Sequence, residues 1–394
     1  MNWLTRTRLI GYRRIMLLMS AIVAIGMILT SQQGIDRMGK PLGTDFLAFW
    51  SASQLALNHQ AAAAYDLARI YAVEVAAMPV DPGLSSFLYP PPFLLLCMPL
   101  GLAPYFISLA LWIVSTGLAY GIVVHHWLVT QPVAARGATM TILAFPAVLI
   151  NAGHGQNGFL TGALLGGGLW LLDRRPWIAG TLLGLLVIKP QMAFAIPVLV
   201  LASGRWRVAI AGTVAALLFC VVSWLVLGAG AWSGFLSGGQ TARDIMEAGL
   251  VEPGKMVSAF AAVKVLGGGA TLAYAGQGLI AIGAAFALGG SVRQRNASPN
   301  AHAALCVAAS TLMSPFFLDY DLTILAFPLA WLFTEGLRRG FLSWEKAILV
   351  AAYLLPIGAR NLALHFGVPV APFLLITVFA ACVRAARFTA QPAS

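Results

Sequence analysis

The sequence predicts an all-α integral membrane protein, a polytopic bundle of about twelve transmembrane helices. Of its 394 residues, 60% are hydrophobic and 9% are charged, and the mean hydropathy is +0.85. Soluble globular chains carry about a quarter charged residues. Several apolar stretches approach the ~20 residues that cross a hydrocarbon core of about 30 Å. Basic residues punctuate the short loops between these stretches. This composition excludes a soluble enzyme or a soluble binding module.

The net charge of +11 comes from basic residues that lie in the termini and in the short loops between apolar segments, as in many membrane proteins. Cytoplasmic loops of such proteins collect Lys and Arg, so we expect both termini in the cytoplasm and no nucleic-acid partner. The expected location is the plasma (inner) membrane, crossed many times. The arginines concerned are Arg6, Arg8, Arg13, Arg14, Arg174, Arg175, Arg205, Arg207, Arg293, Arg295, Arg338, Arg339, Arg384 and Arg387.

The first apolar segment, 15–30, lacks a small-residue cleavage site and is predicted to be a retained anchor. Four cysteines stand singly inside apolar segments, with no CxxC and no Cys/His cluster. They are predicted to be packing residues and not disulfides or metal ligands. They are Cys97, Cys220, Cys306 and Cys382.

The first external loop is expected at about 31–88, and Asp45 stands near its start. Phe46, Phe49, Trp50 and Leu57 follow at roughly helical spacing, which predicts an amphipathic helix lying along the membrane face. A second helical patch covers 61–78, so the loop should hold two short interfacial helices. Asp45 has two interpretations: it caps a helix N-terminus, or it is a general base held at the water–lipid boundary.

The apolar run 93–129 is too long for one straight crossing at 1.5 Å per residue. The prolines of Tyr89-Pro90-Pro91-Pro92 end any preceding helix, and Pro99 and Pro104 cut the run itself. We expect 93–103 to dip into the outer leaflet and only 105–127 to cross, because two crossings would put the later arginine loops on alternating sides.

The ten further predicted spans are separated by polar turns. A glycine-rich turn, Gly153-His154-Gly155-Gln156-Asn157, suits backbone that meets a polar substrate. Lys189-Pro190 joins two short segments. The spans are 138–151, 159–172, 177–188, 191–202, 208–227, 273–288, 301–313, 322–333, 345–357 and 369–383.

A second large external loop is expected at about 228–272, solvated and partly mobile. It carries Arg243, Asp244, Glu247, Glu252, Lys255 and Lys264. The whole chain, 1–394, is predicted to form one transmembrane domain. It shows no strong internal repeat, which counts against a transporter built from duplicated halves.

Ionisable side chains at membrane depth are costly, so those on the external side are functional candidates. Each has a plainer alternative. Lys189 either binds phosphate or snorkels to the interface. Asp319 and Asp321 form a DxD pattern, which helix capping explains more simply than metal binding. His154 and His365 could fill the interface. The set is Asp45, Asp66, His154, Gln156, Lys189, Asp319, Asp321, Arg360 and His365.

Five motifs occur in the order in which one family has them: Gly43-Thr44-Asp45-Phe46, Tyr65-Asp66, Phe87-Leu88-Tyr89-Pro90-Pro91-Pro92-Phe93, Gly155-Gln156-Asn157 and Ile188-Lys189-Pro190. Through them the chain resembles glycosyltransferase family 87. These are integral-membrane enzymes of the GT-C class, related to polyprenyl-phosphate-mannose-dependent mannosyltransferases. The resemblance implies a catalytic aspartate in the first external loop, at Asp45. Family members often have Ser or His after the Ser-Pro pair, where this chain has Phe316, Phe317 and Leu318.

The resemblance implies transfer of a sugar, mannose above others, from a polyprenyl-phosphate donor to a lipid or glycan acceptor on the external (periplasmic) face. The reaction would invert a β-linked donor to an α-linked product, without a cofactor or metal. Asp45 would be the base, and Lys189 and Arg360 would neutralise the leaving phosphate. Predicted substrate-binding residues are Trp50, Asp66, Tyr89, His154, Gln156, Asn157, Asp319, Asp321 and His365.

The competing interpretation is a transporter or flippase of a lipid-linked sugar, which would also need a basic, aromatic cavity. Asp45 separates the two, because transport would use it as a coupling charge, whereas catalysis needs it to accept a proton. The sequence contains no Gly-x-x-x-x-Gly-Lys-Ser/Thr loop, so it gives no indication of an ATP-driven pump.

Overall fold

The computed structural model describes residues 6–129, 140–247, 253–294 and 298–389. Over these residues the chain is helical, and extended pairing is limited to isolated bridges such as that between Met256 and Leu318. The predicted all-α class is therefore confirmed. The four cysteines are unpaired, and three of them are buried, as expected of packing residues.

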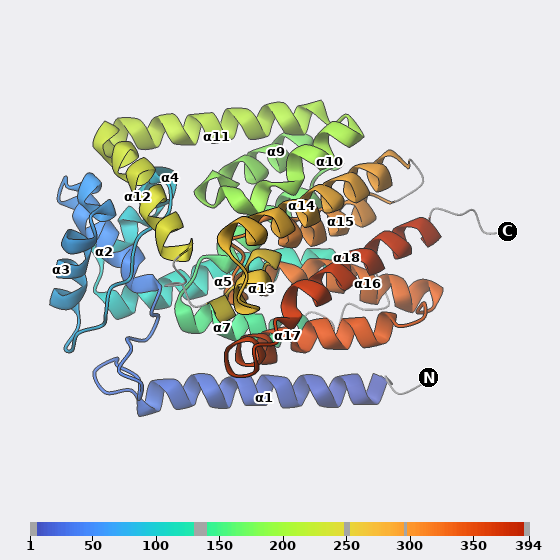
Figure 1. Ribbon diagram of the computed structural model, residues 1–394, viewed down its shortest axis with the longest axis horizontal. Helices are drawn as coiled ribbons and strands as arrows, with labels where there is room; N and C mark the ends of the chain where they lie inside the picture. The colour runs from blue at the N-terminus through green and yellow to red at the C-terminus, as the bar shows by residue number, and fades with distance from the viewer. Residues whose placement is uncertain (1–5, 130–139, 248–252, 295–297, 390–394) are drawn as a thin grey trace.

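In the part of the chain that the structure describes, six helices are long and apolar enough to cross a membrane, which makes this a multi-pass membrane protein. Large apolar side chains such as Leu217, Leu218 and Phe286 stand exposed on them, as contact with lipid requires. Helices α1 and α11 run roughly along the long axis of the molecule, on its two opposite sides (Figure 1). The six lie in α1 (Arg6–Thr30), α5 (Tyr105–Val129), α11 (Trp206–Leu227), α14 (Ala270–Arg293), α17 (Glu345–Phe366) and α18 (Val370–Thr389).

The other predicted spans contain shorter helices, some of which are buried in the bundle. Helix α8 is buried along nearly its whole length, and most of α15 is buried too. At 1.5 Å per residue these helices are shorter than the hydrocarbon core, so the total of about twelve crossings stays a prediction. They are α7 (Pro146–His154), α8 (Gly158–Trp170), α9 (Pro176–Gly184), α10 (Ala195–Ser203), α15 (Pro299–Met313) and α16 (Ala326–Arg339).

Helices α9 and α11 approach each other at glycines. A Cβ on Gly184 would lie 2.2 Å from the carbonyl oxygen of Gly212, and one on Gly180 would lie 2.5 Å from that of Val208. Gly180 and Gly184 are four residues apart, which is the small-xxx-small spacing of close helix pairs in membranes. Any larger side chain at Gly184 would force the two backbones apart.

The two ends of the bundle differ. The start of α1 and the end of α18 lie at one end, and α2, α3 and α12 lie at the other (Figure 1). At the first end, Arg205 forms a bidentate ion pair with Asp173, and Arg384 donates to the carbonyl of Ser343. That both termini and the arginine loops share the cytoplasmic side stays a prediction. Arg6, Arg136 and Arg295 lie outside the described residues or side chains.

The first loop differs from its prediction in one respect. Helix α2 (Phe46–Leu57) does not lie along a surface, because Phe46, Leu47, Phe49 and Ala52 are all buried. The prediction of an amphipathic helix was wrong because α2 packs against neighbours on most sides. These are η1 (Ala61–Tyr65), α3 (Leu67–Ala77), α4 (Pro91–Cys97) and η2 (Met98–Leu102).

The second loop is also more ordered than predicted. It forms α12 (Ala229–Glu247), η5 (Pro253–Lys255) and α13 (Ala259–Val265). Met246, Met256 and Phe260 bury one another there, so this part of the loop is neither solvated throughout nor structureless. Glu252 lies outside the described residues. The run 93–129 contains one long helix, α5, after the short α4 and η2, as the single-crossing interpretation requires.

Candidate active site

Asp45 precedes α2 in a turn whose shape the neighbouring residues fix. Gly43 has φ +74°, where other residues are strained, and the hydroxyl of Tyr105 lies 2.9 Å from its carbonyl oxygen. The Asp45 side chain caps no backbone N–H of α2. Instead its carboxylate accepts hydrogen bonds from Gln156 Nε2 at 3.1 Å and Thr44 Oγ1 at 3.3 Å. The capping alternative therefore does not explain this residue.

His154 lies on the other side of the same carboxylate. Its Nδ1 is 3.7 Å from Asp45 Oδ1 and 2.8 Å from Thr44 Oγ1, and its backbone carbonyl accepts the Asp45 N–H at 3.1 Å. The Thr44 hydroxyl has one proton. If it donates that proton to Asp45, His154 must donate to Thr44 from Nδ1. The Asp45 side chain is 31% exposed, so it remains reachable by a substrate.

The Gly155-Gln156-Asn157 turn lies beside Asp45 and hydrogen-bonds to it through Gln156. The Oε1 atom of Gln156 accepts from the hydroxyl of Tyr89 at 3.0 Å and from the backbone N–H of Asn157 at 2.9 Å. Because both groups are donors, the amide must present its NH₂ to Asp45. Gly155 has φ +61°, and a Cβ there would lie 2.6 Å from Phe46 Cβ. Through its bonds to Asp45, Tyr89 and the Asn157 backbone, Gln156 fixes the position of the Asp45 carboxylate.

A buried ion pair forms the floor of this region. Lys189 Nζ lies 2.6 Å from Asp321 Oδ1 and 3.1 Å from Asn157 Oδ1, and the two charged side chains are 2% and 0% exposed. The ammonium also faces the ring of Tyr320, 5.1 Å from its centroid. Lys189 therefore does not snorkel. It lies where η3 (Leu185–Ile188) and η4 (Pro190–Ala193) meet, so the predicted junction of two short helices is confirmed.

A second acidic side chain, Asp319, lies among cations from three separate elements. Arg360 Nη1 of α17 is 4.0 Å from Asp319 Oδ2. Met256 pairs antiparallel with Leu318, and Val257 N–H donates to the Phe317 carbonyl at 2.8 Å. This register places Lys255 opposite Asp319. Burial raises the pKa of the Asp319 carboxyl, and the charges of His154, Arg360 and Lys255 oppose that rise. Lys255 was not among the residues that the sequence indicated.

Three predicted substrate residues have other surroundings. Trp50 donates to the carbonyl of Ala103 at 3.0 Å, which ties α2 to the end of η2. Asp66 caps α3, accepting from two backbone N–H groups at 2.9 and 3.1 Å. His365 is exposed in the last turn of α17. The structure brings none of these three into the hydrogen-bonded network around Asp45.

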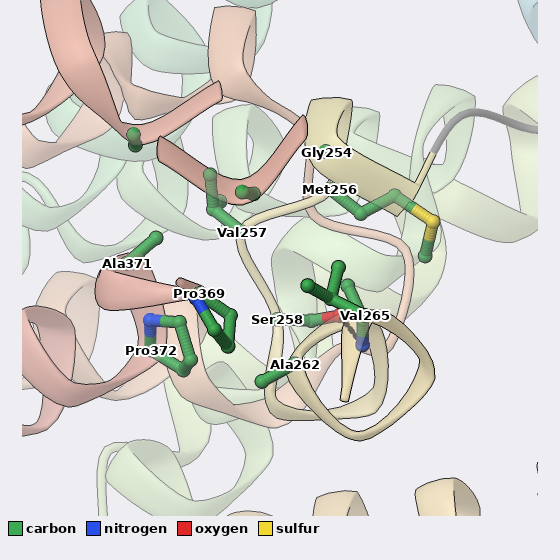
Figure 2. Close-up of a pocket in the computed structure, with 12 residues that line it drawn as sticks. Gly254, Met256, Val257, Ser258, Ala262, Val265, Pro369, Ala371 and Pro372 are labelled. Atoms are coloured by element: carbon green, nitrogen blue, oxygen red, sulfur yellow. Dashed lines mark hydrogen bonds between the residues drawn. The ribbon is translucent and has the colours of Figure 1, made fainter. Parts of the chain in front are cut away.

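An apolar crevice lies between η5, α13 and the start of α18, and its lining includes none of Asp319, Arg360 and Lys255. It is small, with a cavity volume of about 10 Å³. Pro369 and Pro372, around the start of α18, face Ser258 and Ala262 across it (Figure 2). Among the described residues, no group of three or more His, Cys, Asp or Glu side chains could hold a metal ion.

A multi-pass helical bundle that holds a cluster of acidic, amide and basic side chains defines a membrane protein with a polar centre. Comparison with known families identifies which one: the model of glycosyltransferase family 87 matches residues 87–315, more than half of the chain. The chain belongs to this family and is a membrane glycosyltransferase. No curated protein and no solved structure matches it. Tyr89, Gln156 and Lys189 lie inside the matched range, whereas Asp45, Asp319 and Arg360 lie outside it.

Proposed function

We propose that the protein transfers a hexosyl group, mannose in the first instance, from a polyprenyl-phosphate donor to a hydroxyl of a lipid or glycan acceptor. The reaction takes place at the end of the bundle that holds Asp45, which we expect to face the periplasm, and it inverts the anomeric centre. One observation carries the proposal. The Asp45 carboxylate is partly exposed, and it caps no helix. Neutral donors hold it on one side, and His154 faces it on the other.

In the proposed step, Asp45 accepts the proton of the acceptor hydroxyl while the acceptor oxygen bonds to the anomeric carbon. The bond from that carbon to the phosphate oxygen breaks, and the phosphate leaves with the electron pair. A base must lie within hydrogen-bond reach of the proton it takes. Gln156 and Thr44 keep the carboxylate in one orientation, so its exposed edge is the part that can meet a substrate.

The leaving phosphate needs positive charge close to it. Arg360 is partly exposed at 34% and can grip phosphate oxygens with its fork. Lys189 is different, because Asp321 and Asn157 already occupy two of its three donor positions. We propose that Lys189 acts on the phosphate from beneath, through its charge and its remaining N–H group, while Arg360 contacts it directly.

The test is the variant Asp45→Asn. Asparagine keeps the size of the side chain but cannot accept the proton, so turnover should fall by ~10²–10⁴-fold. The measurement uses purified protein in detergent, a radiolabelled polyprenyl-phosphate mannose donor and a membrane lipid extract as acceptor. Thermal unfolding should stay near that of the wild type, because the Asp45 side chain caps nothing.

Asp66→Asn is the matched control. Asp66 also starts a helix and does cap it, and Asn and Asp serve equally well at that position. This variant should keep its turnover. Near-normal turnover in Asp45→Asn would remove Asp45 from the reaction. In a parallel assay with the protein reconstituted in lipid vesicles, a labelled donor that crosses the membrane with no glycoside formed would instead favour a flippase.

A further inference from the structure

The turn between α16 and α17, residues 340–344, holds a tryptophan in an unfavourable backbone conformation. Trp344 has φ +70°, a left-handed conformation that is an outlier for a bulky residue. Gly340, at the other end of the turn, has φ +86°, which costs a glycine little. Burial does not explain the choice of tryptophan, because Trp344 is 77% exposed. Such a conformation persists only where its surroundings enforce it, and it marks a candidate functional residue.

A buried ion pair enforces the shape of this turn. Arg339 Nη2 lies 2.6 Å from Glu345 Oε1, and the two side chains are 7% and 0% exposed. Arg339 Nη1 also donates to the carbonyl of Gly340 at 2.8 Å. The second carboxylate oxygen of Glu345 accepts the backbone N–H of Leu342, also at 2.8 Å. Both halves of the turn are therefore tied to one ion pair, which fixes the exposed tryptophan between them in place.

The last turns of α18 lie against the same turn. Arg384 Nη2 donates to the carbonyl of Ser343 at 2.6 Å, directly beside the tryptophan. The guanidinium of Arg339 lies over the ring of Phe388, 5.6 Å from its centroid. Arg384, Arg387 and Phe388 are all exposed, and their i, i+3 and i+4 spacing makes them neighbours on the helix surface. Two guanidinium groups and two aromatic rings therefore share one exposed surface.

This surface carries an excess of positive charge. Helices α16 and α17 have one acid each, and α18 has none. Both acids are already engaged, Glu335 with Arg338 and Glu345 with Arg339. Among the described residues, neither Arg384 nor Arg387 forms an ion pair with an acid. An anion bound at this surface would therefore meet two guanidinium groups whose charge no acid of these three helices balances.

The position of the surface indicates which anion it meets. Helices α17 and α18 are two of the six candidate membrane spans, and the surface lies at the start of one and the end of the other. It therefore lies where spanning helices reach lipid headgroups, the level at which tryptophan anchors membrane proteins. A headgroup phosphate can accept parallel N–H bonds from a guanidinium. A soluble anion would use the arginines and leave both exposed rings without a role.

We infer that Trp344, Phe388, Arg384 and Arg387 form a binding site for the headgroup of an anionic phospholipid. Arg384 and Arg387 bind its phosphate, and Trp344 lies at the level of the glycerol backbone. The lipid belongs to the leaflet at the end of the bundle where α18 ends, whereas α2 and the residue before it, Asp45, lie at the other end (Figure 1). The inference is therefore independent of the proposed sugar transfer.

The experiment places the purified protein in phosphatidylcholine nanodiscs with a rising fraction of phosphatidylglycerol that is brominated near the headgroup. Bromine quenches tryptophan fluorescence on contact, and the signal of Trp344 is the difference between the wild type and Trp344→Phe. Brominated phosphatidylcholine gives the reference. Phosphatidylglycerol should be preferred at Trp344 by roughly tenfold, as expected of one charge-assisted hydrogen bond. Arg384→Gln should remove most of this preference.

Arg175→Gln is the matched control. Arg175 is exposed and lies close in sequence to another exposed tryptophan, Trp177, but it belongs to the loop before α9. It should leave the preference at Trp344 unchanged. Equal quenching by the two lipids would overturn the proposal, as would an Arg175→Gln variant that behaves like Arg384→Gln. Reversal of the quenching by millimolar glycerol phosphate would indicate a site for a soluble phosphate instead. Absence of quenching by either lipid would mean that Trp344 lies away from lipid or is covered by a second copy.

Trp344→Gly separates lipid binding from folding. Glycine adopts a φ of +70° without strain, so the melting temperature of this variant in detergent should equal or exceed that of the wild type. The rise in melting temperature on moving from phosphatidylcholine to phosphatidylglycerol nanodiscs should be smaller than in the wild type, because the anchor is gone. An unchanged rise would overturn the role of Trp344. A lower melting temperature in detergent would contradict the argument that the fold holds Trp344 under strain.

Discussion

Asp45 and Asp321 stand at the two ends of one chain of contacts that passes through Gln156, Asn157 and Lys189. At one end, Asp45 is 31% exposed and its hydrogen-bond donors are neutral. At the other end, Asp321 is fully buried and bound to an ammonium. The same residue type therefore has two roles. The buried carboxylate, Asp321, holds Lys189 in place, whereas the exposed carboxylate, Asp45, is accessible to a substrate.

The intermediate residues make the two ends depend on each other. Asn157 accepts from Lys189 through its side chain and donates through its backbone to Gln156, which in turn donates to Asp45. A change in the buried pair should reach Asp45 through this path. Three kinds of variant test how far the two ends differ.

The largest effect should follow from breaking the buried pair. Lys189→Met leaves Asp321 buried without its partner, and Asp321→Asn does the same to Lys189. Removing one member of a buried ion pair costs about 3–5 kcal/mol of stability. The double variant buries no unpaired charge and should recover much of that loss. The measurement is thermal or denaturant unfolding in detergent.

The double variant also isolates the role of Lys189 in binding. Because it folds without the charge, a weaker donor affinity there would reflect lost attraction for the phosphate and not a damaged floor. Donor affinity equal to that of the wild type would leave Lys189 with a structural role alone. Single variants as stable as the wild type would contradict the ion pair itself.

The next effect concerns the residue that orients Asp45. Gln156→Leu removes the N–H that holds the Asp45 carboxylate in one orientation, so kcat should fall roughly tenfold, as expected for the loss of one charge-assisted hydrogen bond, with little change in KM. This positioning role differs from a purely structural one, which would lower stability and leave the kcat of the folded protein unchanged.

Gln54→Leu is the control for this comparison. Gln54 lies on α2 and donates to the carbonyl of Gly101 at 2.7 Å, without touching Asp45. It should lower stability and leave the kcat of the folded protein near that of the wild type. An unchanged kcat in folded Gln156→Leu would show that the contact with Asp45 does not position the carboxylate.

The sequence predicted those parts of the molecule that local chemistry determines. Proline marks the junction at Lys189-Pro190 and the start of α5, and a hydropathic run marks each long helix. Distant pairing could not be predicted. Lys189 and Asp321 are 132 residues apart, and neither position indicates the other. Lys255 was missed because only the Met256–Leu318 register brings it to Asp319. Helix α2 looked amphipathic because its burial depends on partners from other segments.

Another buried carboxylate, Glu74, has no ion-pair partner among the described residues, and so sharpens the comparison. Its Oε2 accepts the backbone N–H of Ser85 at 3.0 Å, and its Oε1 has no hydrogen-bond partner in the part of the chain that the structure describes. Burial raises the pKa of Glu74 from its usual value of 4.5 to about 7, and the Ser85 N–H only partly opposes this. Unlike Asp321, Glu74 has no cationic partner among the described residues that supports its charge.

The smallest expected effect is therefore a pH dependence. Between pH 4.5 and 7 the folded protein binds a proton at Glu74 that the unfolded chain does not, so the free energy of unfolding should fall as the pH rises through that window. One proton gives a slope of at most about 1.4 kcal/mol per pH unit. Glu74→Gln keeps the hydrogen bond to Ser85 and cannot ionise, so its unfolding free energy should lack this slope. Ser85 also donates to the carbonyl of Thr44, next to Asp45, so the lower stability at higher pH should loosen the segment beside Asp45.

Thermal melts of the wild type and of Glu74→Gln across this pH window test the prediction. Parallel curves would mean that Glu74 titrates as an ordinary exposed acid, and that burial without a cation leaves its charge unpenalised.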